Sequence, residues 1–109
     1  MKNDGKNPSL STLLRRAKNT VDKPLYSFNL SNCQAKVYHS EKYLVLKSYD
    51  TIVAIYDIES QTEYDFLKLV YGYSATSVRH ISRFINKYIP ACFPFACVKR
   101  IRIEKPTDI

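Results

Sequence analysis

The sequence contains little glycine, no tryptophan and no long apolar run. Its 109 residues include two glycines and five prolines, which is too few for a fibrous chain or a flexible linker. No stretch approaches the roughly 18 apolar residues of a membrane-spanning helix. The first residues also lack the apolar core of a signal peptide. These absences predict a globular protein of a cytoplasm, without contact to a membrane.

Cysteine is scarce too, and its spacing excludes the common metal sites. The chain has an odd number of cysteines: Cys33, Cys92 and Cys97. An odd number, together with the lack of a secretion signal, favours reduced thiols. The gap between Cys92 and Cys97 does not match the two-residue spacing of zinc knuckles, and His39 and His80 add no ligand spacing. We therefore expect the cysteines to be small buried residues, and we expect neither a metal nor a cofactor.

Positive charge is the strongest global feature. Seventeen lysines and arginines stand against ten acidic residues, which gives a net charge of +7. Residues 1–23 carry +4, residues 24–75 carry −2, and residues 76–109 carry +5. If the two basic ends meet on one face of the folded chain, that face has the electrostatic footprint of a polyanion binder. The alternative is a basic surface that serves solubility alone.

The chain divides into a tail and one domain. Residues 1–8 are polar and predict a flexible tail, whereas residues 9–109 predict a single domain with its core over about 24–105. Leucines at helical spacing predict a short N-terminal helix over about 10–21, capped by a serine at position 9 or 11. Docking of this helix on its own domain is the simplest expectation.

Strands are expected through the middle of the chain, where Tyr, Val, Ile, Leu and Thr dominate and apolar residues alternate. The expected strands cover about 24–30, 34–40, 42–49, 51–58 and 63–73. Turns are expected at Asp50 and at 59–62. A further strand over 96–105 alternates isoleucine with arginine, which is typical of a sheet edge.

The clearest helical pattern covers about residues 76–89 and ends at Pro90. Its apolar face predicts packing across the sheet, while Arg79, Arg83 and Lys87 form one stripe on its opposite face. The predicted fold class is therefore α+β: an antiparallel sheet of about four to six strands, packed by this helix, plus the short N-terminal helix.

Two segments resemble a pattern found in small uncharacterised proteins of bacterial viruses and prophages. The pattern reads SY-x-T-x-V-A, followed about twenty residues later by YS-x-T-x-x-x-H-I-x-x-F. The matching residues are Ser48, Tyr49, Thr51, Val53, Ala54, Tyr73, Ser74, Thr76, His80, Ile81 and Phe84. The resemblance covers about residues 44–88 and departs at Ser77 and Val78, where the family more often has Thr and Ser. It implies a small domain in the cytoplasm of a bacterial host, and no mechanism.

The leading functional prediction is a non-enzymatic module that contacts nucleic acid or another polyanion. The cations expected to neutralise phosphates are Arg79, Arg83 and Lys87. The auxiliary cations are Arg15, Arg16, Arg100 and Arg102. Hydroxyl donors at the helix start, where free amides and the helix dipole favour an anion, are Ser74, Thr76 and Ser77. Simple helix capping is the alternative for these three residues.

Two other classes of function stay open beside this one. A protein-binding inhibitor or accessory factor would use those of the nine tyrosines in the chain that are exposed. A hydrolase-type activity would use His80 as the base for a neighbouring hydroxyl. The sequence has no nucleophile elbow, phosphate loop or metal-ligand spacing that would support a hydrolase, so we expect that the protein is not an enzyme.

Overall fold

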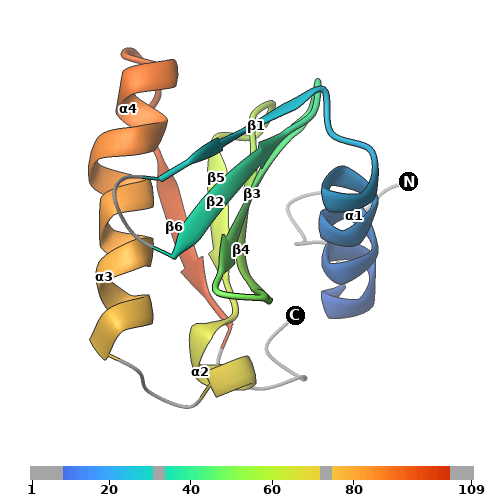
Figure 1. The fold of residues 1–109 in the computed structure, drawn as a ribbon. Helices are drawn as coiled ribbons and strands as arrows, with labels where there is room; N and C mark the ends of the chain where they lie inside the picture. Colours follow the sequence, from blue (N-terminus) through green and yellow to red (C-terminus); the bar gives the residue numbers. More distant parts are fainter. Residues whose placement is uncertain (1–8, 31–33, 72–74, 104–109) are drawn as a thin grey trace.

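A sheet of six strands lies between two layers of helices in the part of the chain that the structure, a computed structural model, describes (Figure 1). That part comprises residues 9–30, 34–71 and 75–103, with the backbone alone for 71, 75 and 76. The strands are β1 (Tyr26–Asn29), β2 (Ala35–His39), β3 (Tyr43–Ser48), β4 (Thr51–Asp57), β5 (Thr62–Asp65) and β6 (Lys99–Arg102). The helices are α1 (Leu10–Asp22), α2 (Leu67–Tyr71), α3 (Ala75–Arg83), the π-helix η1 (Phe84–Tyr88) and α4 (Ile89–Cys92). The α+β prediction is confirmed.

The strands follow one another across the sheet in the order of the sequence, from β1 to β6. The first five form antiparallel pairs, whereas β6 pairs with β5 in parallel. The wholly antiparallel sheet that the sequence predicts is therefore wrong at this one pair. The reason is the long connection between β5 and β6, which crosses one face of the sheet as helices before the chain returns. The predicted edge position of the last strand is confirmed.

Helix α1 covers one face of the sheet, so the prediction that it docks on its own domain is confirmed (Figure 1). It begins where the Ser9 hydroxyl accepts a hydrogen bond from the Thr12 backbone N–H at 3.2 Å. Leu13 and Ala17 are fully buried against strand residues of the same cluster, among them Val45.

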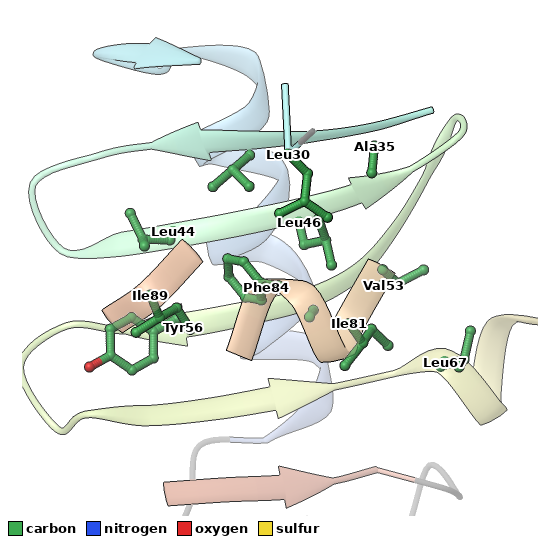
Figure 2. Packing of buried hydrophobic residues seen from close by; sticks show 12 residues of the cluster. Leu30, Ala35, Leu44, Leu46, Val53, Tyr56, Leu67, Ile81, Phe84 and Ile89 are labelled. Atoms are coloured by element: carbon green, nitrogen blue, oxygen red, sulfur yellow. The ribbon is translucent and has the colours of Figure 1, made fainter. Parts of the chain in front are cut away.

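The opposite face of the sheet is covered by one continuous helical rod made of α3, η1 and α4. Phe84 is fully buried and lies at the centre of this second cluster, beside Leu46, Ile81 and Ile89 (Figure 2). Because the two helix layers share one sheet, β3 buries residues in both clusters: Leu44 and Leu46 in this one and Val45 in the cluster of α1.

The predicted end of the long helix at Ile89 is wrong, because the rod continues through Pro90 to Cys92. In the π-turn, the Ile89 N–H donates to the Phe84 carbonyl five residues earlier. Pro90 therefore falls in the first turn of α4, where its missing N–H and fixed φ are tolerated.

The strand predicted over 63–73 is also shorter than expected. It ends at Asp65, and the Val70 N–H donates to the Phe66 carbonyl at 3.0 Å in a helical bond of α2. A short run that is apolar on all sides fits a buried strand or a buried helix equally well, so periodicity could not decide between them.

Two further expectations concern cysteines and membranes. Cys92 and Cys97 are exposed, so the prediction of buried thiols is wrong for these two, and Cys33 lies outside the described residues. Cys92 follows the last buried turn of the rod, and Cys97 precedes the edge strand, so neither faces the core.

In the described ranges, no helix has the length and apolar character needed to cross a membrane.

Candidate functional site

The predicted stripe of cations lies on the outer side of the α3–η1 rod. Arg79, Arg83 and Lys87 are all exposed, whereas Ile81 and Phe84 on the inner side are buried. Among the residues that the structure describes, none of the three cations takes part in a salt bridge. Within the described residues these three charges are therefore uncompensated, and the rod, whose apolar face is fixed to the sheet, holds them on one rigid element.

The hydroxyl residues expected at the start of this helix do not form one exposed anion site. Ser74 and the side chain of Thr76 lie outside the described residues. Ser77 is 1% exposed, and its hydroxyl lies 3.1 Å from the Ser48 hydroxyl. Ser77 therefore faces the sheet, and the prediction that it donates to an external anion is corrected by its burial.

A buried hydrogen-bonded network joins α3 to the end of β3. The Ser48 hydroxyl lies 2.7 Å from His80 Nδ1 as well as 3.1 Å from the Ser77 hydroxyl. Burial lowers the pKa of His80, and the nearby Arg83 guanidinium lowers that pKa further. The imidazole is therefore neutral near pH 7 and shares one hydrogen bond with the serine.

The turn between β3 and β4 adds an aromatic ring to this network. Tyr49 has a φ of +55°, which is unusual for a residue other than glycine, asparagine or aspartate. Its ring centroid lies 5.9 Å from that of His80. The segments around Ser48 and Tyr49 and around His80 thus meet in the fold.

The serine–histidine pair has the distance of a nucleophile and its base, but it lacks access to a substrate. Ser48 is 0% exposed and His80 is 6% exposed. A nucleophile must reach the atom it attacks, which a fully buried hydroxyl cannot do in this conformation. The arrangement is suited to hold α3 against the end of β3.

Replacing Ser48 with alanine should therefore weaken the fold. We expect Ser48→Ala to lower the free energy of unfolding by about 1–3 kcal/mol, because His80 and Ser77 both lose a buried partner. Urea denaturation followed by circular dichroism measures the change. The matched control is Ser82→Ala on the exposed side of α3, which should stay within about 0.5 kcal/mol of the parent protein. Equal effects of the two substitutions would contradict a structural role for the network.

Arg15 and Arg16 do not join the stripe, because α1 covers the other face of the sheet (Figure 1). The expectation that both basic ends of the chain meet on one face is therefore wrong for these two residues. The Arg16 guanidinium instead lies over the Tyr43 ring at 5.7 Å. Sequence periodicity shows which side of a helix is apolar, and it does not show which face of a sheet that side covers.

The two arginines of β6 differ in their surroundings. Arg100 Nε lies 2.9 Å from Asp65 Oδ2 and 3.8 Å from Glu63 Oε1, so two carboxyl groups surround its charge. Arg102 is exposed, and no described residue forms a salt bridge with it. Of the two, only Arg102 is available to an external anion.

Glu63 is the least expected polar residue of the structure. Its side chain is 0% exposed, and within the described residues neither carboxyl oxygen has a hydrogen-bond partner. Burial raises the pKa of Glu63 well above its ordinary value of 4.5; Asp65 raises it further, and Arg100 and Arg102 oppose the shift. The alternation of E-Y-D in β5 with R-I-R in β6 is the sequence signal for this cluster, because Glu63 stands opposite Arg100 in the parallel register.

Comparison with known proteins gives a family and no activity. Residues 10–92 match the model of a family described as "Family of unknown function (DUF8033)". The match begins with α1 and ends with α4, so it includes both helix layers and the first five strands. No curated protein and no solved structure matches the chain significantly.

Proposed function

Since the chain belongs to the DUF8033 family, whose function is unknown, its function has to be inferred from its own surfaces. We propose that the protein is a non-enzymatic binding module that contacts the phosphate backbone of nucleic acid through the α3–η1 rod. The contact residues are Arg79, Arg83 and Lys87, with Arg102 as an exposed auxiliary. The resemblance to proteins of bacterial viruses and prophages makes the cytoplasm of a bacterial host the proposed place of action.

The observation that supports this proposal best is the uncompensated stripe. Like charges four residues apart destabilise a helix by a few tenths of a kcal/mol per pair, so this stripe lowers the stability of the helix that carries it. From Arg79 to Lys87 the rod rises by roughly 12 Å, at about 1.5 Å per residue. Along one nucleic-acid strand, phosphates follow at about 3.4 Å of axial rise, so three cations can contact phosphates of one strand.

The proposed binding is independent of base sequence. Contacts to phosphate orient a protein on nucleic acid, whereas specificity requires contacts to base edges or a deformation of the duplex. The exposed side of the rod offers Ser82 and Asn86 beside the cations, and both are short side chains. A salt-dependent, low-specificity interaction is therefore the expected behaviour.

The test is a salt titration of binding to duplex and single-stranded DNA and RNA. We expect Arg79→Ala/Arg83→Ala/Lys87→Ala to lower the magnitude of the log–log salt slope by about 2–3, at about 0.7–0.9 per phosphate contact. Affinity at low salt should fall at least tenfold. Fluorescence anisotropy with labelled oligonucleotides measures both quantities.

The matched control removes the same charge from the other helix layer. Arg15, Lys18 and Lys23 are exposed residues of α1 and its end, so Arg15→Ala/Lys18→Ala/Lys23→Ala lowers the net charge equally. If both triple variants lose the same affinity, net charge alone explains the binding and the proposed surface is wrong. Absence of binding by the folded parent protein at low salt would reject the proposal outright.

A second candidate is supported by the tyrosines. Tyr26 is 53% exposed and Tyr49 is 51% exposed, so two rings are available to a protein partner, as in the inhibitor or accessory-factor alternative. Such a partner would be lost on Tyr26→Ser or Tyr49→Ser and would depend weakly on salt. The salt slope of the titration above therefore separates the two functions.

A further inference from the structure

The two edges of the sheet differ sharply in charge. At one edge, β6 carries Lys99, Arg100 and Arg102, and charges of this kind discourage pairing with a second strand. At the other edge, β1 has the sequence YSFN and carries no charge or proline; the irregularity lies just before it, where the Leu25 N–H donates to the His39 carbonyl at 2.8 Å although His39 stands opposite Tyr26. The chain therefore protects one edge against strand addition and leaves the other open.

The outer edge of β1 meets no other strand among the described residues. The Leu30 N–H donates to the Ala35 carbonyl at 2.9 Å. Bonded positions alternate along an antiparallel pair, so Tyr26 and Phe28 also direct their backbone groups toward β2. It follows that Ser27 and Asn29 direct their N–H and C=O groups outward, where no described strand meets them.

Two neighbouring aromatic side chains of β1 are exposed on one face of the sheet. Tyr26 and Phe28 are 53% and 54% exposed, and their ring centroids lie 5.3 Å apart. Both rings contact His39, at centroid distances of 4.6 Å and 5.6 Å. The Tyr88 hydroxyl lies 2.5 Å from His39 Nε2, so the cluster is fixed to the helix rod. Burial raises the pKa of Tyr88 to about 12 and lowers that of His39, so two uncharged groups share this hydrogen bond.

We propose that β1 pairs with β1 of a second copy of this chain, antiparallel across a two-fold axis. Ser27 then exchanges both backbone hydrogen bonds with Asn29 of the partner subunit, and the reverse pair does the same. Phe28 stands opposite Phe28 of the partner subunit, as a directly opposed aromatic pair. The result is one continuous sheet through both subunits.

The argument for a second copy as the occupant is that β1 is complementary to itself, because its uncharged edge can meet the same edge without like charges facing each other. A chain of net charge +7 repels itself over most of its surface, and the uncharged β1 edge is a place where two copies can approach. A two-fold axis needs a patch that is complementary to itself, and an antiparallel strand pair centred on one residue meets this condition. The axis is perpendicular to the sheet, so both helix rods lie on the same face of the dimer.

The sharpest test is a cross-link at the centre of the proposed pair. In a background of Cys33→Ser, Cys92→Ser and Cys97→Ser, Phe28→Cys should give a disulfide-linked dimer under mild oxidation. Opposed residues of this kind have Cα atoms about 4.5 Å apart, within the roughly 4.4–6.8 Å that a disulfide requires. Phe95→Cys is the control, because Phe95 is 97% exposed and lies away from β1. Equal cross-linking at both positions reports random collision and overturns the proposal.

A second measurement needs no cross-link. Light scattering coupled to size exclusion should give twice the monomer mass of 12.7 kDa at about 100 μM protein, a concentration at which weak dimers are populated. Ser27→Pro removes an outward N–H and should give a monomer, whereas Ser27→Ala keeps this N–H and should stay dimeric. A monomeric parent protein, or a dimer that survives Ser27→Pro, overturns the inference. The stripe variant Arg79→Ala/Arg83→Ala/Lys87→Ala should remain dimeric, so failure of the proposed function leaves this result intact.

Discussion

Phe84→Ala is expected to lower the free energy of unfolding by about 3–5 kcal/mol. The Phe84 ring is fully buried at the centre of the cluster between the helix rod and the sheet, and its removal leaves a cavity that the rigid strands cannot fill (Figure 2). Small domains have about 5–15 kcal/mol of stability in total, so this one substitution removes a large part of it. Urea denaturation followed by circular dichroism measures the loss.

The control for this prediction is the same substitution at a phenylalanine whose side chain is exposed to solvent. Phe95 is 97% exposed, so Phe95→Ala should change the free energy of unfolding by less than about 0.5 kcal/mol. A loss below about 1 kcal/mol for Phe84→Ala would mean that the rod does not pack on the sheet as described.

Glu63→Gln is expected to stabilise the protein increasingly as the pH rises. Because burial raises the pKa of Glu63, its neutral form favours the folded state. That contribution is fully present below the ordinary value of 4.5 and is lost as the pH rises through the higher pKa of the folded state. Glutamine has the same shape and cannot ionise, so the variant escapes this loss. The difference in unfolding free energy between variant and parent, measured from pH 4 to pH 9, should grow with pH.

An exposed glutamate provides the control for this experiment. Glu59 is exposed in the turn between β4 and β5. Glu59→Gln should therefore show no comparable growth of the stability difference with pH. A difference for Glu63→Gln that stays constant across the range, or a variant less stable than the parent at pH 8, would contradict a neutral buried carboxyl.

Much of the sheet could be predicted from the sequence because its strands are short apolar segments between turns. Apolar residues alternate in β2 and form nearly continuous runs in β3 and β4, as in central strands, and the turns are found at 49–50 and 58–61, beside the predicted ones. The helix after the sheet was equally clear from its apolar stripe. The segment 67–71 is harder to predict, because four of its five residues are apolar without a clear period and α2 covers barely more than one turn.

The contacts within the candidate site could be predicted from the sequence less well than the helices and strands that carry them. His80 could be placed on the helix from the sequence, but its partner Ser48 lies 32 positions away in the chain. The separation of Arg15 from Arg79 depends on which face of the sheet each helix covers, and no local pattern encodes that choice. The cluster of Glu63 with Arg100 likewise depends on a parallel register that arises only in the folded sheet.

The single parallel pair also has a consequence for the order of folding. The strands from β1 to β5 are joined by short connections, so each hairpin closes a small loop. Strand β6 can pair only after the 33 residues from 66 to 98 have crossed the sheet, which is the largest loop closure between neighbouring strands. It is also the last strand to be synthesised. The helix rod with its cations is therefore secured at both ends only in the final step, and until then the nascent meander exposes an uncovered apolar face to the cell's chaperones.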